Sequence, residues 1–309
     1  MGYGLWQYIG RRSVWAIVTI FGITVLNFVV IYAVPVNPAQ VIAGIHAPHQ
    51  TVLNIERALG LNRPIWVQYG IFLWNLIHLN LGYSYFAHRP VLHMIEQALP
   101  NTLRLGIAAL LAELVIGITV GYIAAFHSPG FLDRFLSLAA IGGMSIPNYW
   151  LGTMFIYLFA YLFPIFPLYG QGWGNLILPA LTIGITGAAW YMRLLRTAIL
   201  DIRHANYVRT AQAKGLTDRA VAIRHVTRNA LIPVVTLAGM DLAGLLSGVV
   251  IIETVFGWPG IGLMTYTAVQ NLDIPTILGV VLFASSLIVG FNLLVDILYA
   301  LLDPRIRYD

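Results

Sequence analysis

The sequence predicts an all-α integral membrane protein with six transmembrane helices, both termini in the cytoplasm, and a cytoplasmic loop between helices four and five. Of its 309 residues, 59% are hydrophobic and only 9% are charged, whereas a soluble domain carries about 25% charged residues. Six apolar runs are each long enough to cross the ~30 Å hydrocarbon layer of a bilayer. In this arrangement most lysines and arginines fall on one side of the membrane, as the positive-inside rule requires.

The six runs cover residues 13–33, 102–126, 135–163, 176–192, 231–252 and 275–302. The first follows Arg11 and Arg12 and reaches the ~20 residues needed to span, so we interpret it as a retained helix and not as a signal peptide. A seventh run, residues 64–81, is interrupted by polar residues and contains Trp66 and Trp74. This pattern favours a helix that lies on the membrane surface.

The distribution of basic residues fixes the predicted orientation. With the N-terminus inside, all of the 17 lysines and arginines face the cytoplasm except Arg57, Arg63, Arg89 and Arg104. Counting residues 64–81 as a span would place one strongly basic segment on the extracellular side, against the positive-inside rule. The predicted organisation is an N-terminal segment with the first helix (1–33), an extracellular or periplasmic segment with an interfacial helix (34–100), and a five-helix core (101–309) that includes the loop 201–230.

The cytoplasmic loop between spans four and five carries an unusual density of positive charge. Its pattern predicts a helix over residues 206–214, a left-handed break at Gly215, and a second helix that Thr217 caps and Asp218 begins. Small residues, Ala211, Ala213 and Gly215, mark a turn that another backbone could approach closely. The basic residues advance by about 140° per step and form no single stripe. A surface for a protein partner therefore fits better than a helix resting on anionic lipid.

At these residues the sequence resembles a known family. The segment "YVRTAQAKGL" from Tyr207, followed by "RHVTRNALIP", is similar to the conserved cytoplasmic loop of ABC-importer permeases of the dipeptide/oligopeptide/nickel family. The resemblance extends over nearly the whole chain, through "YIGRR" from Tyr8, "VPVNPA" from Val34, "LGLNRPIWVQY" from Leu59, "NLGYSY" from Asn80, "PNTLRL" from Pro100, "ETVFGWPGIG" from Glu253 and "DPRIR" from Asp303. One departure is that the general importer motif begins Glu-Ala-Ala, where this chain has Arg209, Thr210 and Ala211.

The resemblance implies a permease subunit of an ATP-driven importer for di- or oligopeptides in a bacterial or archaeal cell membrane. It implies a non-identical second permease, two ATP-binding subunits and an extracellular substrate-binding protein as partners, with membrane lipid around the spans and no nucleic acid. It also implies that the loop docks on an ATP-binding subunit. The residues expected at this contact are Tyr207, Arg209, Ala211, Ala213, Lys214, Gly215 and Leu216.

The chain itself contains no ATP-binding motif. A phosphate-binding loop needs Gly-Lys-Ser/Thr, and Lys214, the single lysine, lies between alanine and glycine. We therefore expect no catalytic residue and no cofactor in this chain, with ATP and Mg²⁺ on partner subunits. An intramembrane hydrolase is disfavoured because neither HExxH nor GxSxG occurs. A secondary transporter or channel driven by ions or protons stays open as the alternative, since acidic residues lie inside predicted spans.

Two sets of residues are candidates for the transport path. A charge at mid-bilayer costs about 2.5–3.5 kcal/mol on insertion scales, so acidic residues there should face the bundle interior, for helix packing or for cargo. With Asn148, which follows a proline break, these candidates are Glu113, Asn148, Asp241 and Asp296. The motif from Glu253 predicts a tight extracellular turn, and the resemblance implies a re-entrant gate beside the binding protein, with Glu253, Phe256, Trp258, Pro259 and Gly260 as its residues.

Histidines on the predicted extracellular side raise the question of a metal site. Five of the eight fall there: His46, His49, His78, His88 and His93. We expect no bound metal, because no carboxylate is expected at ligand spacing from them. Nickel or another small solute as cargo stays open.

Overall fold

The computed structural model describes residues 5–33, 38–43, 48–167, 170, 172–246 and 249–302. The motif segments that begin at Val34 and Asp303 lie partly or wholly outside these residues, as does His46. The chain forms two compact units. Unit one contains residues 1–100 and 264–309, and unit two contains residues 101–263. In the described part of the chain the regular secondary structure is helical apart from one hairpin of two strands with two residues each.

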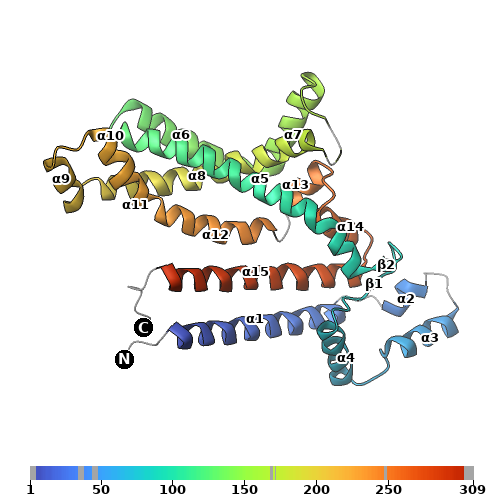
Figure 1. The fold of residues 1–309 in the computed structure, drawn as a ribbon. Helices are drawn as coiled ribbons and strands as arrows, with labels where there is room; N and C mark the ends of the chain where they lie inside the picture. The colour runs from blue at the N-terminus through green and yellow to red at the C-terminus, as the bar shows by residue number, and fades with distance from the viewer. Residues whose placement is uncertain are drawn as a thin grey trace. The chain divides into compact units, whose positions relative to one another are not determined.

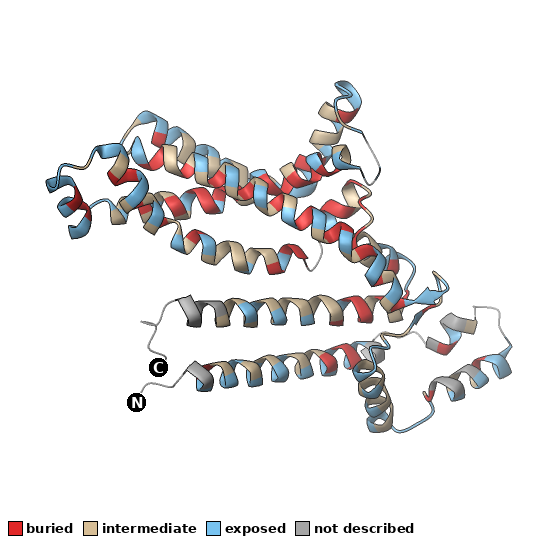
Figure 2. Cartoon of the chain, in the orientation of Figure 1, coloured by how far each residue is buried: buried red, intermediate tan, exposed pale blue. Residues whose placement is uncertain are grey.

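Unit one is built around two long helices, α1 (Leu5–Ala33) and α15 (Ile274–Leu302), which pack side by side (Figure 1). Arg12 near the start of α1 forms an ion pair of 3.0 Å with Asp296 near the end of α15. The two helices are therefore antiparallel. Many of their apolar side chains are exposed (Figure 2), as expected of helices whose solvent is lipid.

The remaining elements of unit one are short. They are α2 (Pro38–Ala43), α3 (His49–Leu59), α4 (Ile65–Ile77), β1 (Tyr83–Ser84) and β2 (Arg89–Pro90). Helix α4 has 13 residues and is too short to span a bilayer at 1.5 Å per residue. It packs on α1 through Tyr69, whose hydroxyl lies 2.9 Å from the Thr24 hydroxyl and whose ring lies 5.1 Å from that of Phe28.

Unit two packs around α8 (Trp173–Ile202), the most buried of the long apolar helices. Helix α5 (Val91–Phe126) begins in unit one and contributes residues 101–126 to unit two. Gly117 and Gly121 of α5 lie so close to Tyr191 and Met192 of α8 that a Cβ at either glycine would collide. Small residues thus allow close backbone approach, the usual way that membrane helices associate.

The other elements of unit two follow in chain order. They are α6 (Phe131–Ser145), α7 (Asn148–Ile156), the π-helix η1 (Tyr157–Leu162), α9 (Asn206–Ala213), α10 (Asp218–Val221), the π-helix η2 (Ala222–Thr227), α11 (Arg228–Ala230), α12 (Ile232–Leu246), α13 (Val250–Val255) and the start of α14 (Ile261–Gln270).

Within the described residues, five helical segments are long and apolar enough to cross a membrane: Gln7–Val30, Val91–Phe126, Trp173–Ile202, Asp218–Leu246 and Ile274–Ile297. The third predicted span, residues 135–163, is divided between α6 and α7 at Ile146 and Pro147. Proline lacks the N–H that a continuous helix would use there. The structure is thus an all-α membrane protein with five continuous candidate spans, and the count of six stays a prediction.

Candidate functional sites

The basic loop forms the helix, break and helix that its sequence predicts. Helix α9 ends at Ala213, and Gly215 has a left-handed backbone with φ 80°. Thr217 caps α10, because its hydroxyl accepts a hydrogen bond from the N–H of Ala220 at 3.4 Å. A Cβ on Gly215 would meet no atom within 4 Å. The turn therefore needs glycine for its backbone conformation and not for space.

Helix α9 has a buried face and an exposed face. Val208 and Ala211 belong to the core of unit two. The other fully buried members of this core are Ala125, Tyr191, Leu195, Ile199, Val221, Val226, Ala230 and Val234. Ala211 thus differs from the expectation of a surface residue, because it fills space beneath its own helix.

The exposed face carries most of the predicted contact residues: Tyr207, Arg209, Ala213, Lys214 and Gly215 are exposed, and Leu216 is half-buried. The amide of Asn229 donates to the Tyr207 hydroxyl at 3.2 Å and to the His225 carbonyl at 2.8 Å. The bond between Asn229 and Tyr207 connects α11 to the start of α9. The loop is therefore a folded surface element with cationic side chains on its outer face.

An ion pair that the sequence interpretation missed fixes α6 on α8. Asp133 in the first turn of α6 is buried, and its two carboxylate oxygens accept hydrogen bonds from Arg196 Nε at 2.5 Å and Nη2 at 2.7 Å. These bonds with the guanidinium lower the pKa of Asp133 to about 2. An acidic residue at the start of an apolar run was an available signal, but its partner lies 63 residues away.

Two of the predicted path residues meet inside unit two. Glu113 on α5 is buried, and its carboxyl group lies close to that of Asp241 on α12. Asp241 also accepts a hydrogen bond of 2.8 Å from the hydroxyl of Tyr191 on α8. A Cβ on Gly187 would collide with the Glu113 carboxylate. We call Glu113, Tyr191 and Asp241 the acidic cluster; Glu113 and Tyr191 are buried in unit two, and Asp241 is half-buried.

The acidic cluster retains unused bonding capacity. Oxygen Oε2 of Glu113 is buried and has no hydrogen-bond partner among the described residues. The sequence interpretation did not include Tyr191 or Gly187, which carry no charge and look like ordinary residues of an apolar helix. The other two path candidates lie elsewhere: Asn148 is exposed at the start of α7, and Asp296 pairs with Arg12 in unit one.

The predicted gate is organised by a buried carboxylate. Glu253 is 0% exposed, and its oxygens accept hydrogen bonds from the Thr102 hydroxyl at 2.9 Å and the backbone N–H groups of Gly262 and Leu263 at 2.6 and 3.1 Å. Burial raises the pKa of Glu253, and these hydrogen bonds act in the opposite direction. Glu253 thus holds together three chain segments: its own in α13, the α5 segment at Thr102 before it, and the start of α14 after the turn.

The side chains after Glu253 are also buried. Phe256 and Trp258 are buried, Pro259 is half-buried, and the Trp258 indole N–H donates to the Asn101 carbonyl at 2.9 Å. The Asn101 amide in turn donates to the Pro259 carbonyl at 2.9 Å. Trp258 is therefore a core residue of the turn and does not anchor it to a lipid interface. The residues 253–263 with Asn101 and Thr102 form what we call the gate turn.

Glycines make this compact turn possible. Gly257 has φ 61°, a left-handed conformation. A Cβ on Gly260 would collide with the Glu253 carboxylate and the Thr102 hydroxyl, and one on Gly262 would lie 2.6 Å from the Cα of Val250. The expectation that these glycines produce tight, irregular backbone is confirmed.

The histidines predicted to be extracellular do not assemble into a metal cluster in the described part of the chain, where no group of three histidine, aspartate or glutamate residues is placed to hold an ion. One detail corrects the sequence interpretation: His93 does have a carboxylate neighbour, because its Nδ1 lies 3.4 Å from Glu96 Oε2. A second neighbour, Gln97, lies 2.9 Å from its Nε2.

Two protein-family models and several full-length relatives match this chain. Residues 117–308 match the family model described as "binding-protein-dependent transport system inner membrane component", and residues 5–106 match the N-terminal model of the same system. A putative peptide transport system permease protein of Brucella abortus is 36% identical, with 97% of this chain and 98% of the relative aligned. The dipeptide transport system permease protein of Escherichia coli K12 is 34% identical (98% and 99% aligned), and an Escherichia coli glutathione transport system permease protein is 35% identical (98% and 99% aligned).

Two family models together cover nearly all residues, and full-length relatives exceed 30% identity. The chain therefore belongs to the family of binding-protein-dependent transport system inner membrane components, as a multi-pass, non-catalytic permease subunit of an ABC importer in the bacterial inner membrane.

Proposed function

We propose that this permease imports di- or oligopeptides. The observation that carries the proposal is the full-length similarity to permeases whose names specify peptides, dipeptides or glutathione, which is itself a tripeptide. Nickel or another small solute is the alternative cargo.

The proposed assembly contains a non-identical second permease, two ATP-binding subunits and an extracellular substrate-binding protein. ATP and Mg²⁺ would bind to the ATP-binding subunits. The exposed cationic face of α9, with Arg209, Lys214 and the Gly215 turn, supports a docking role for the loop. Because α9 is anchored in the core of unit two through Val208, a displacement of the loop would be passed on to α8 and α12.

The proposed topology has six spans with both termini in the cytoplasm, where α6 and α7 with η1 together form the third. The Arg12–Asp296 pair supports it, because it places the start of α1 and the end of α15 together. In this topology residues 34–100 and the gate turn face outward, residues 101–309 form the core, and the loop 201–230 faces inward. The acidic cluster would lie beside the transport path, with Asn148 and Asp296 as further candidates.

The test is reconstitution of the complete complex in proteoliposomes loaded with Mg²⁺ and ATP. We expect ATP-dependent uptake of a labelled dipeptide only when the substrate-binding protein is present outside. A proton or sodium gradient without ATP should drive none. Uptake of ⁶³Ni²⁺ with no peptide uptake would refute the proposed cargo, and gradient-driven uptake by this chain alone would refute the importer mechanism.

A further inference from the structure

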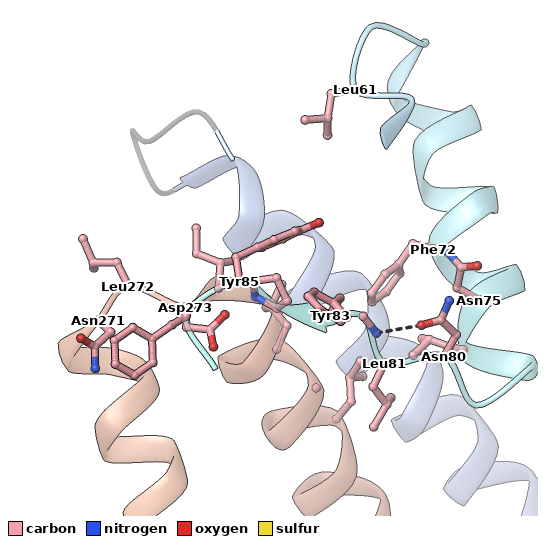
Figure 3. Close-up of a pocket in the computed structure, with 18 residues that line it drawn as sticks. Leu61, Phe72, Asn75, Asn80, Leu81, Tyr83, Tyr85, Asn271, Leu272 and Asp273 are labelled. Atoms are coloured by element: carbon pink, nitrogen blue, oxygen red, sulfur yellow. Dashed lines mark hydrogen bonds between the residues drawn. The ribbon is translucent and has the colours of Figure 1, made fainter. Parts of the chain in front are cut away.

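Unit one contains a pocket that the basic loop, the acidic cluster and the gate turn do not explain. Its volume is about 620 Å³, and it is enclosed by α4, the segment after α4 and the start of α15 (Figure 3). Pockets that bind small molecules usually enclose about 300–1,000 Å³ and combine apolar walls with a few polar groups. Here the walls include Phe72, Tyr83, Tyr85 and Leu278.

The pocket has one buried carboxylate with unused bonding capacity. Asp273 is 5% exposed, and its Oδ2 accepts hydrogen bonds from the hydroxyls of Ser84 at 2.5 Å and Thr276 at 2.7 Å. Both hydroxyl residues are themselves fully buried. Oxygen Oδ1 is also buried but has no hydrogen-bond partner among the described residues. A buried acceptor without a donor is costly, so Oδ1 is suited to a donor from a bound molecule.

The backbone around Asp273 favours a negative charge at this position. Asp273 directly precedes α15, and its carbonyl accepts the N–H of Ile277 at 3.0 Å. The N-terminus of a helix stabilises an anion. The preceding residue, Leu272, has φ 52°, a conformation that leucine rarely adopts. Such backbone strain is often retained where it positions a functional side chain.

The aromatic walls suit a cation next to this carboxylate. The rings of Tyr83 and Tyr85 lie 5.8 Å apart, centroid to centroid, and aromatic faces attract ammonium groups. Burial raises the pKa of Tyr85, and the negative charge of Asp273 raises it further. The Tyr85 phenol therefore stays neutral and adds no second negative charge.

We propose that this pocket binds a small primary amine with an apolar body, namely a short peptide with a free N-terminus and a hydrophobic first residue. The ammonium group donates to Asp273 Oδ1, and the first side chain packs against Phe72, Tyr83 and Leu278. The inference rests on the proposed function, since it makes the free N-terminus of the peptide the group that is recognised on the outward side.

The test measures binding to the full-length chain in lipid nanodiscs by calorimetry, with the dipeptide Phe-Ala and N-acetyl-Phe-Ala as probes. We expect the acetylated peptide to bind at least tenfold more weakly. Asp273→Asn keeps an oxygen for the hydroxyls of Ser84 and Thr276 but removes the charge. It should weaken Phe-Ala binding at least tenfold and leave N-acetyl-Phe-Ala unchanged.

Two further variants serve as a second test and a control. Leu76→Trp places a large side chain into the pocket from α4 and should weaken both peptides. Glu96→Gln changes an exposed carboxylate of the same unit outside the pocket and should change neither. If Asp273→Asn does not fold, the acetylated probe and Leu76→Trp decide the question.

Wild-type affinity of Asp273→Asn for Phe-Ala, equal binding of both peptides, or no binding of Phe-Ala to the wild type would each overturn the proposal. So would a weaker association of the substrate-binding protein with Asp273→Asn when no peptide binds, because the pocket would then accept a protein side chain. Peptide binding without peptide uptake by the complex would refute the proposed function and leave the pocket assigned. Peptide uptake by the complex without peptide binding in this pocket would refute the pocket assignment and leave the proposed function in place.

Discussion

At the scale of single residues, the buried carboxylates have distinct environments. Glu253 accepts hydrogen bonds from three neighbours, whereas Glu113 and Asp273 each retain an oxygen without a partner among the described residues. A carboxylate with satisfied oxygens stabilises local structure, and one with unused capacity is available for a proton, a water or a ligand. We therefore expect a neutral substitution to lower the stability of the protein at Glu253 and to be tolerated by the fold at Glu113 and Asp273.

Glu253→Ala should destabilise the protein by about 3 kcal/mol or more, because it leaves the buried N–H groups of Gly262 and Leu263 without an acceptor. Glu253→Gln keeps one acceptor oxygen and should lose about half as much. Thermal unfolding in detergent measures both, with Glu96→Ala as the exposed control. An alanine variant as stable as the wild type would show that Glu253 does not hold the gate turn.

Asp241→Asn tests whether the acidic cluster recognises cargo charge. The substitution keeps an oxygen for the Tyr191 hydroxyl and removes the second carboxyl group beside Glu113. Because the cluster links three helices, we expect a packing role: the variant should assemble and take up free and N-acetylated peptides equally, while Asp241→Leu should reduce assembly. A selective loss of uptake for free-amine peptides would instead assign charge recognition to Asp241.

At the scale of elements, helix positions depend on a few polar contacts between largely apolar surfaces. The Asp133–Arg196 pair joins α6 to α8, and the Gly215 turn presents α9. Both contacts lie near the end of α8 that leads into the basic loop. Each can be altered without changing the apolar surfaces of the spans.

Acid should weaken the contact between α6 and α8. The folded pKa of Asp133 is about 2, below its ordinary value of 3.8, so the stabilisation is complete above that ordinary value and is lost as the pH falls toward the folded value. Asp133→Asn should lower stability by about 1–3 kcal/mol at pH 6. The difference in melting temperature between wild type and variant, followed from pH 6 down to 2.5, should shrink, and a constant difference would contradict this assignment.

Gly215→Val should uncouple ATP hydrolysis from transport without unfolding the spans. A β-branched side chain resists the φ of 80° at this position, although no neighbouring atom blocks it. We expect loss of ATPase stimulation by loaded binding protein. Gln212→Val is the matched control, since Gln212 is exposed on the same loop, lies in α9 and is not one of the expected contact residues. Normal stimulation and uptake in Gly215→Val would remove the coupling role from this loop.

At the scale of the whole molecule, the topology decides which site meets which partner. The proposed arrangement places the basic loop inside and the pocket, gate turn and His88 outside. The chain contains no cysteine, so single-cysteine variants need no altered background. A cysteine at Ala213 should react with an impermeant maleimide only from the cytoplasmic side, and one at His88 only from the outside. Labelling of both from one side would reject the six-span topology.

Much of the local structure could be predicted because its signals lie within a few residues of one another. Apolar run length identified the continuous spans, Gly215 and Thr217 marked the break and the cap in the basic loop, and the glycines after Glu253 marked the tight turn. Helix ends were less accurate: α5 begins at Val91 and continues through Pro100, well before the predicted start at residue 102. The apolar run begins later than the helix because the first turns of α5 carry polar residues.

The sequence by itself determined the membrane class, the helical architecture and the family, since composition, periodicity and ordered motifs are local properties of the chain. Only the tertiary structure decided which residues meet. Asp133 pairs with Arg196, Tyr191 with Asp241 across 50 residues, and Ser84 with Asp273 across 189 residues. It also decided that Ala211 and Trp258 are buried. Such contacts depend on how distant helices pack, and an apolar helix of nearly uniform composition does not show in its own sequence which face meets protein and which meets lipid.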